Sequence, residues 1–262
     1  MTRKIIVTGA AGRMGSTLVR MILASEDLDL AAAIDPHSES LRNLDSLCMV
    51  ASDLENVIDS LPGAIIIDFT APAAAMRHAQ LAAARSNPIV IGTTGLSEAQ
   101  KGELKQLAER TPILLSPNMS IGVNVLLEVL PELARMLGKD YDAELSEIHH
   151  KHKKDAPSGT ALRLAEAVAE GKDVALANAA RYHRQGIIGE RSADEIGIQS
   201  LRGGDVVGVH TVYFMGPGER IEITHHAHSR ENFAGGALHA ARWLAEQKPG
   251  KLWSMGDVLK SQ

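Results

Sequence analysis

The sequence predicts an α/β fold in which a doubly wound parallel sheet is joined to a second, mixed α+β domain. In the first half, short apolar runs alternate with helical stretches, and beyond about residue 120 several segments show period-two alternation instead. Strands and helices in strict alternation form parallel sheets with right-handed crossovers. We therefore expect one domain over residues 1–120, a second over 121–230, and a C-terminal helical segment, 231–262, that returns to the first domain.

The apolar runs of the first half are short enough to be strands. The run at 64–69 is apolar except for Asp68, as expected for a strand that is buried on both faces of a parallel sheet. The expected strands cover residues 4–8, 28–35, 64–69, 88–92 and 113–115. Helices are expected at about 14–25, after Pro72 and from near Ser97.

The second half predicts helices at 122–137 and 158–170, with a strand at 143–148 between them. A long polar stretch, 171–194, follows. Two alternating segments, 206–215 and 220–226, flank the turn Gly216-Pro217-Gly218 and predict antiparallel strands. An alanine-rich helix at 232–246 ends the pattern.

Composition excludes several classes of function. The net charge of −5 is opposite to the basic surface that nucleic acids require. The chain contains no apolar run of the about 20 residues that a membrane helix needs. Cys48 is the single cysteine, so an intrachain disulfide is excluded. We find no secretory signal at the N-terminus, and we expect a cytoplasmic protein with no nucleic-acid or membrane partner.

A glycine-rich turn separates the first predicted strand from the first predicted helix. Gly9, Gly12 and Gly15 give the spacing G-x-x-G-x-x-G, and the acidic Asp35 ends the second predicted strand. Glycines at this place let a dinucleotide pyrophosphate approach the helix N-terminus, and the acid can accept hydrogen bonds from the ribose. A turn without a cofactor is the alternative, but the order of strand, turn, helix and acid favours a Rossmann-type domain that binds NAD(H) or NADP(H).

A second loop at a predicted strand end, Gly92-Thr93-Thr94-Gly95, lies on the side of the sheet where ligands bind. It can be read as a contact for the nicotinamide or as an ordinary turn, and the pattern alone does not choose between them.

The most informative segment is a basic loop, residues 149–154, in which all six side chains can carry positive charge. A solvated basic loop is the usual explanation of such a run. Against it, the loop follows a strand and precedes a helix, and three of its residues are histidines. The following Pro157-Ser158-Gly159-Thr160 also resembles a helix start that can hold an anion. These features indicate an acidic substrate and a histidine that transfers protons.

Metal binding is a second interpretation of His149, His150 and His152, but neighbouring lysines would repel a cation and no further ligands complete a familiar site. A second histidine group, His225, His226 and His228, is interpreted as packing or interface residues. We therefore predict no metal.

Residues 147–161 resemble the signature of the dihydrodipicolinate reductase family, which acts in diaminopimelate and lysine biosynthesis. Further blocks at 7–15, 67–70, 90–95 and 116–124 match the family in the same order, so the likeness covers nearly the whole chain. Among the departures, Pro36 follows the acid where members that use NADPH readily often have a basic residue.

The resemblance implies roles for particular residues. His149 and Lys153 match the family's proton donor/acceptor and proton donor, and His150, Gly159 and Thr160 match its substrate contacts. The positions that match cofactor contacts are Gly9, Ala10, Ala11, Gly12, Arg13, Met14, Asp35, Gly92, Thr93, Thr94, Ser116, Pro117, Asn118 and Met119.

The resemblance also implies a reaction and an assembly. Hydride would pass from NADH, the preferred cofactor, or from NADPH to a cyclic dicarboxylate, 4-hydroxy-tetrahydrodipicolinate, with loss of water. The second domain would bind the substrate and form a homotetramer through its sheet. Two alternatives remain: another Rossmann reductase of amino or imino acids, such as an aspartate-type dehydrogenase, and a nucleotide-sensing module. Neither would need the signature at 147–161.

Overall fold

The computed structural model describes residues 2–261, and the chain divides into two compact units. The first unit is built from Met1–Ile121 and Arg230–Gln262, and the second is Gly122–Ser229. The two ends of the chain therefore contribute to the same unit.

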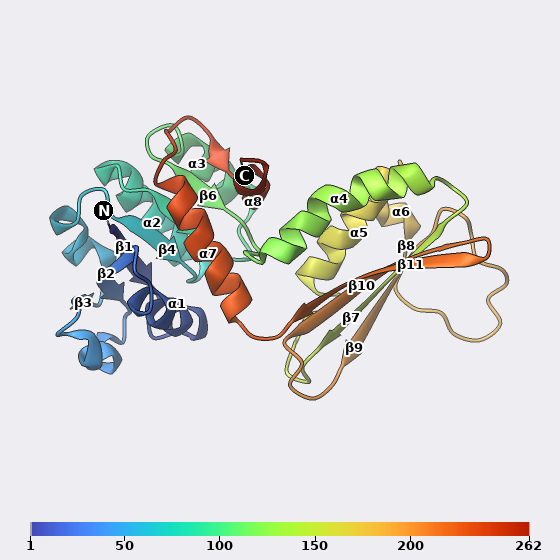
Figure 1. Ribbon diagram of the computed structural model, residues 1–262, viewed down its shortest axis with the longest axis horizontal. Helices are drawn as coiled ribbons and strands as arrows, with labels where there is room; N and C mark the ends of the chain where they lie inside the picture. The colour runs from blue at the N-terminus through green and yellow to red at the C-terminus, as the bar shows by residue number, and fades with distance from the viewer. Residues whose placement is uncertain (1, 262) are drawn as a thin grey trace. The chain divides into compact units, whose positions relative to one another are not determined.

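The first unit contains a seven-stranded parallel sheet in the order β12-β6-β5-β4-β1-β2-β3 (Figure 1). β1 has β2 on one side and β4 on the other, so the strand order reverses at β1. Ligands of such sheets bind beyond the carboxyl ends of the strands at this reversal. The strands are β1 (Arg3–Thr8), β2 (Leu28–Ile34), β3 (Met49–Ala51), β4 (Ile65–Asp68), β5 (Ile89–Ile91), β6 (Ile113–Leu115) and β12 (Leu252–Trp253).

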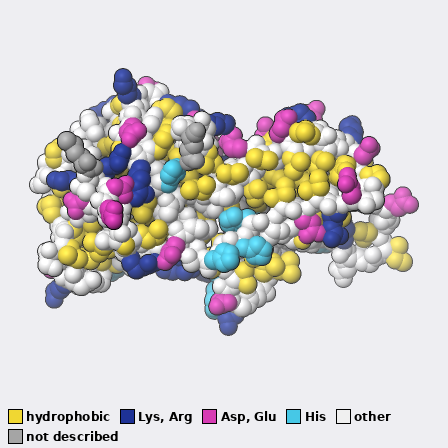
Figure 2. Space-filling model, viewed as in Figure 1, with side chains coloured by type: hydrophobic (Ala, Val, Ile, Leu, Met, Phe, Trp, Pro, Cys, Tyr) yellow, Lys and Arg dark blue, Asp and Glu magenta, His cyan; other side chains and the backbone are white. Residues whose placement is uncertain are grey.

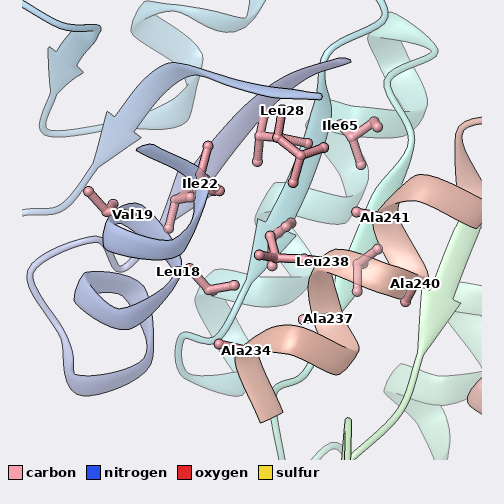
Figure 3. Close-up of a cluster of buried hydrophobic side chains, with 14 of the residues drawn as sticks. Leu18, Val19, Ile22, Leu28, Ile65, Ala234, Ala237, Leu238, Ala240 and Ala241 are labelled. Atoms are coloured by element: carbon pink, nitrogen blue, oxygen red, sulfur yellow. The ribbon is translucent and has the colours of Figure 1, made fainter. Parts of the chain in front are cut away.

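Helices cover both faces of this sheet, because successive side chains of a strand point to opposite faces. Ile5 and Val7 of β1 pack in one apolar cluster, and Ile6 between them packs in another. Helices α1 (Arg13–Leu23), α7 (Glu231–Leu244) and α8 (Met255–Lys260) contribute to the first cluster, shown in Figure 3. Helices α2 (Pro72–Arg85) and α3 (Glu98–Leu107) contribute to the second.

The second unit contains a five-stranded mixed sheet in the order β11-β10-β7-β9-β8. β10 is antiparallel to both β7 and β11, whereas β9 is parallel to β7 and β8. The strands are β7 (Asp142–His149), β8 (Ala180–Arg181), β9 (Ile196–Arg202), β10 (Gly208–Gly216) and β11 (Glu219–Ala227).

One face of this second sheet is packed under helices. Leu130 of α4 (Ile121–Leu137) and Leu164 of α5 (Gly159–Gly171) lie in one apolar cluster with Leu145 and Phe214 of the sheet. A third, short helix of this region, α6 (Leu176–Ala179), begins the segment that leads to β8. The face that carries Glu147 and His149 is the same helix-covered face, because these residues follow Leu145 at intervals of two.

The structure adds elements to the middle of this unit. The polar stretch 171–194, for which no element was predicted, contains α6 and β8. β9 was not predicted, and its parallel pairing with β7 makes the sheet mixed rather than purely antiparallel.

Over residues 2–261, no helix combines the length and the apolar character that crossing a membrane would require.

Candidate active site

The glycine turn joins the carboxyl end of β1 to the N-terminus of α1. Gly9 has a positive φ of 67°, and the Gly12 amide donates to the Gly9 carbonyl oxygen at 2.9 Å. A Cβ on Gly15 would lie 2.1 Å from that same oxygen, so only glycine lets the helix start so close to the turn. Gly12 is the N-cap of α1 and has no side chain to occupy the first-turn amides. This cradle fits a pyrophosphate group, which helix N-termini bind readily.

Asp35 follows β2 and lies against the glycine turn. Its Oδ2 accepts a hydrogen bond from the Ala11 amide at 3.1 Å, and its Oδ1 accepts from the His37 amide at 3.0 Å. Asp35 is 7% exposed, and the two amide hydrogen bonds hold its carboxylate beside the turn. The structure thus brings together the two parts of the predicted nucleotide site.

A buried carboxylate at the end of β4 connects several neighbouring loops. Asp68 is fully buried, and its Oδ2 lies 2.7 Å from Thr8 Oγ1 and 2.6 Å from His78 Nδ1. Its Oδ1 accepts from the Thr70 amide at 3.0 Å and from Thr93 Oγ1 at 2.9 Å. Burial opposes ionisation, but the hydrogen bond and charge of His78 prevail and lower the pKa of Asp68. The Asp68 carboxylate therefore holds both Thr8, which precedes the glycine turn, and Thr93 of the loop that follows β5.

The remaining predicted cofactor residues follow β5 and β6. A Cβ on Gly92 would lie 2.3 Å from the Phe69 ring, so this glycine permits close packing of two strand ends. Thr93 is buried and Thr94 is exposed. In the next loop Ser116 Oγ donates to the Asn118 carbonyl oxygen at 2.7 Å, Pro117 is exposed and Met119 is buried. Because the strands are parallel, all these loops lie at one edge of the sheet.

The second group of predicted residues lies at the end of β7. His149 Nδ1 is 2.5 Å from Glu147 Oε2, and both residues are buried. Arg202 on β9 donates hydrogen bonds to the same carboxylate: its Nη1 lies 2.8 Å from Oε2 and its Nη2 lies 2.7 Å from Oε1. The Ser158 amide also donates to Oε1 at 3.1 Å. One carboxylate thus holds the predicted catalytic histidine and the start of α5.

The ionisation states in this group follow from its contacts. Burial opposes ionisation of Glu147, but hydrogen bonds from Arg202 and His149 lower its pKa to about 2. The pKa of His149 is lowered, chiefly by burial, while Glu147 opposes that effect. At neutral pH the pair is therefore a carboxylate and a neutral imidazole.

A second buried histidine stands beside His149. The ring of His210, on β10, makes an edge contact with that of His149 at a centroid distance of 5.1 Å. His210 Nε2 lies 3.0 Å from Ser158 Oγ, which also caps α5 by accepting from the Ala161 amide. Burial lowers the pKa of His210 to about 3, so it stays neutral. The Ser158 hydroxyl therefore joins the cap of α5 to His210 through two hydrogen bonds.

The other predicted residues lie around this group. Lys153 Nζ is 2.9 Å from Asp155 Oδ1, and its side chain is 19% exposed. His150 is half-buried, and its ring lies 6.2 Å from that of His152. Gly159 and Thr160 begin α5, and a Cβ on Gly159 would meet no atom within 4 Å. The helix start is therefore open to a ligand at Gly159.

Sequence reasoning gave no role to four residues of these sites: Glu147, Arg202, His210 and Asp68. Glu147 could have been found, because residues two apart on a strand share a face and a carboxylate beside a histidine is a common pair. Arg202 and His210 could not, because they reach the site only through the pairing of β9 and β10 with β7.

The additional histidines form no metal site in the part of the chain that the structure describes. His225 is half-buried, whereas His226 and His228 are exposed. Figure 2 shows histidine side chains gathered on one face of the molecule. The interpretation of His225, His226 and His228 as packing or interface residues stays a prediction.

Comparison with known proteins gives a consistent result over the whole chain. Residues 3–119 match the family described as "Dihydrodipicolinate reductase, N-terminus", and residues 122–259 match "Dihydrodipicolinate reductase, C-terminus". A protein of Nitratidesulfovibrio vulgaris (strain DP4), named 4-hydroxy-tetrahydrodipicolinate reductase, is 57% identical over 98% of this chain and 100% of its own length. A protein of the same name from Oleidesulfovibrio alaskensis is 54% identical over 99% of this chain and 100% of its own.

Among solved structures, the dipicolinate-bound dihydrodipicolinate reductase from Paenisporosarcina sp. TG-14 is similar at a TM-score of 0.78, with 26% identity. The match covers 97% of this chain and 98% of that one. A myo-inositol dehydrogenase from Corynebacterium glutamicum, 15% identical with a TM-score of 0.58, shares the fold.

Proposed function

Because the chain belongs to the dihydrodipicolinate reductase family, we propose that it reduces 4-hydroxy-tetrahydrodipicolinate to tetrahydrodipicolinate with a nicotinamide cofactor. In this reaction the substrate takes up one hydride from NADH or NADPH and one proton, and it loses one water molecule. The product serves diaminopimelate and lysine biosynthesis. The identity of more than 50% to two relatives of this name, over nearly their full length, supports the proposal.

The observation that carries this function is the shared carboxylate of Glu147. It contacts both His149 Nδ1 and the Ser158 amide at the start of α5. A proton-exchanging imidazole is thereby fixed next to a helix N-terminus, which attracts anions. This combination suits a substrate that carries carboxylates and must exchange protons during its reaction.

The first unit supplies the proposed cofactor site. Gly9, Ala10, Ala11, Gly12, Arg13 and Met14 would hold the pyrophosphate, and Asp35 the ribose of the adenosine. The loops that contain Gly92, Thr93, Thr94 and Ser116 to Met119 would hold the nicotinamide end. When bound, the cofactor supplies the hydride.

The substrate would bind at the start of α5. Gly159 and Thr160 would hold a carboxylate with backbone and hydroxyl groups, and His150 would contact the substrate. Dipicolinate, which the Paenisporosarcina relative binds according to its description, is a planar ring with two carboxylates. It belongs to the chemical class proposed for this chain.

Protons would be exchanged by His149 and Lys153. The ammonium group of Lys153 can donate a proton to the substrate. The neutral imidazole of His149 can accept one through its unprotonated nitrogen. A nearby cation also stabilises negative charge that develops on the substrate.

We further propose a preference for NADH over NADPH, because Asp35 would repel the 2′-phosphate of NADPH and Pro36 has no charge to offset it.

We also propose that the enzyme is a cytoplasmic homotetramer. The half-buried single cysteine, Cys48, has no cysteine to pair with in its own chain and suits a reducing compartment.

The direct test is NADH oxidation, followed by its absorbance, with enzymatically generated 4-hydroxy-tetrahydrodipicolinate as the substrate. We expect oxidation that depends on both the substrate and the enzyme. If NADH is consumed only with a simple amino or imino acid, the aspartate-type dehydrogenase alternative replaces this proposal. Tight NADH binding with no turnover of either substrate would favour the nucleotide-sensing alternative.

A further inference from the structure

We propose that Glu147, held by Arg202, is a positioning residue that fixes the tautomer of His149, so that Nε2 exchanges protons with the substrate. This inference rests on the proposed function for its catalytic consequence. The tautomer of His149 itself concerns the second unit alone, and it can be tested without substrate.

The tautomer follows from a chain of contacts. Arg202 reaches both carboxylate oxygens of Glu147, at 2.7 and 2.8 Å, and this pairing keeps the group ionised. A carboxylate only accepts hydrogen bonds, so the 2.5 Å contact requires His149 Nδ1 to carry the proton. In a neutral ring Nε2 then holds the lone pair.

The environment of His149 keeps the ring neutral. Glu147 on its own strand faces Nδ1, Arg202 approaches from β9, His210 from β10 and Lys153 from the following loop. Two of these neighbours are cations and His210 is neutral, so the carboxylate is the single negative group among the four. Burial and the two cations outweigh that carboxylate and lower the pKa of His149.

The Nε2 side of the ring is left open by a glycine. A Cβ on Gly208 of β10 would lie 3.1 Å from His149 Nε2, closer than carbon atoms ordinarily approach. Any side chain there would crowd the atom that faces the substrate. Gly208 does not have a positive φ, so access to Nε2 explains this glycine better than backbone conformation does.

The same carboxylate also fixes the start of α5 through the Ser158 amide. In Glu147→Gln the side-chain amide retains a single oxygen. We expect this oxygen to face the Ser158 amide, because that backbone donor cannot move away. The new amide NH₂ then faces His149 Nδ1, which must become an acceptor. The proton of the His149 ring then moves to Nε2, so Nε2 no longer has a lone pair on the side of Gly208.

The test is a comparison of the full-length wild type, Glu147→Gln and Glu147→Asp, with Glu144→Gln as a matched control. Glu144 lies on the same strand and pairs with Arg184 and Arg191, but it touches no histidine. Long-range ¹H–¹⁵N spectra of histidine-labelled protein report which ring nitrogen carries the proton, and the His149 signals are assigned by their absence in His149→Asn. Substrate kinetics, NADH affinity and the melting temperature are measured on the same samples.

We expect protonated Nδ1 in the wild type, Glu144→Gln and Glu147→Asp, and protonated Nε2 in Glu147→Gln. The kcat of Glu147→Gln should fall by roughly 10²–10⁴-fold, the usual contribution of a general acid or base. NADH affinity should be unchanged, and Glu147→Asp should recover part of kcat. Removal of the carboxylate also removes the contribution that raises the pKa of His149, so the acidic limb of the kcat profile should move to lower pH.

Two results would overturn the inference: protonated Nε2 in the wild type, or a kcat for Glu147→Gln no lower than that of Glu144→Gln. The wild-type spectrum decides the first point even if Glu147→Gln does not fold. If the wild type failed to reduce the proposed substrate, the function would be wrong, whereas the tautomer would still be read from the spectra.

A second comparison tests the open side of the ring. Gly208→Ala should lower kcat/KM for the substrate, because its methyl group crowds Nε2. Gly203→Ala is the control, since a Cβ there would meet no atom within 4 Å. Equal activity of the two variants would show that Nε2 is not the working atom.

Discussion

His149 and Lys153 are close in sequence but have contrasting surroundings. His149 is buried and neutral beside a carboxylate, whereas Lys153 remains partly exposed and pairs with Asp155 at the surface. Under the proposed function, this places an acceptor and a donor of protons in one short segment. The division would let a run of basic residues carry out chemistry rather than simply solvate a loop.

We predict that His149→Ala and Lys153→Ala each lower kcat by roughly 10²–10⁴-fold, as expected for loss of a proton-transfer group. NADH affinity should stay nearly intact, because neither residue lies in the unit that holds the nucleotide site. His152→Ala and Lys154→Ala are the controls, since both are exposed members of the same loop. A double variant, His149→Ala with Lys153→Ala, that retained wild-type kcat would contradict the assignment.

The choice of cofactor also depends on single residues. Both oxygens of Asp35 are fixed by backbone amides, so the charge cannot turn away from a 2′-phosphate. Pro36 offers no compensation, and the exposed His37 side chain lies 3.6 Å from the negative Glu39. Arg13 is an exposed cation of the glycine turn, whose Ala11 amide contacts Asp35, and it could oppose the effect.

We therefore predict a higher kcat/KM with NADH than with NADPH, by roughly tenfold for each 1.4 kcal/mol of repulsion. The ratio should shrink at high ionic strength, because salt screens the exposed phosphate. It should also shrink in Asp35→Asn. Equal or better use of NADPH by the wild type would refute the argument, and Arg13 and His37 would then be the residues to substitute.

At the scale of elements, the glycine turn depends on contacts closer than a side chain allows. We predict that Gly15→Ala weakens NADH binding and lowers the melting temperature, because its Cβ would lie 2.1 Å from the Gly9 carbonyl oxygen. Gly102→Ala in α3 is the control: its Cβ would meet no atom within 4 Å, and alanine stabilises a helix interior by roughly 0.5–1 kcal/mol over glycine. If Gly15→Ala bound NADH like the control, the close approach of turn and helix would not matter.

Most elements of the first unit could be predicted, because fully buried strands and amphipathic helices leave regular patterns. β4 and β6 occur where continuous apolar runs predict them, and α3 begins after Ser97, which forms a capping box with Gln100. β3 and β12 were not predicted, and neither contains a fully buried residue.

β9 shows why the second unit was harder to predict. Gly197, its second residue, is unfavourable in an isolated strand. In the sheet a side chain there would collide with Glu144, since a Cβ would lie 1.8 Å from Oε2. The glycine is explained by a contact with a residue 53 positions earlier, which local sequence does not reveal. Arg202, at the end of the same strand, was missed for the same reason.

At the scale of the folded chain, a buried neutral histidine makes stability depend on pH. The pKa of His210 is lowered by burial from an ordinary value of 6.5 to about 3. The unfolded chain therefore binds a proton at pH values where the folded chain does not. Stability from this source is complete above pH 6.5 and decreases as the pH falls toward 3, by about 1.4 kcal/mol per pH unit for one such group.

We predict that the melting temperature of His210→Gln falls less than that of the wild type between pH 6.5 and pH 4, because glutamine does not titrate there and its amide can still hydrogen-bond to the Ser158 hydroxyl. His152→Gln, at an exposed histidine, should follow the wild-type curve. Parallel curves for His210→Gln and the wild type would show that His210 is already protonated or does not contribute. The comparison uses each protein's own value at neutral pH as reference, so a constant loss of packing does not affect it.

The proposed tetramer makes a prediction about the second sheet. Its helix-covered face is apolar, whereas the opposite face carries Tyr213, Thr224 and His226, and also Leu201 with 48% of its surface exposed. Within residues 122–229, all of which the structure describes, no helix packs on that opposite face. A broad sheet face of mixed polarity with an exposed leucine is suited to burial against identical sheets in a symmetric assembly.

We predict that the wild type sediments as a tetramer and that Thr224→Arg dissociates it to smaller species. The arginine would add a charge to this face on the edge strand β11, where pairing with its own symmetry copy is repulsive. Gln106→Arg, at an exposed position of α3 in the first unit, adds the same charge elsewhere and should leave the tetramer intact. Sedimentation velocity over a range of concentrations measures the species directly, and circular dichroism of each variant confirms that the chain remains folded. A folded Thr224→Arg variant that remained tetrameric would place the subunit contact on another surface, whereas a monomeric wild type would refute the assembly itself.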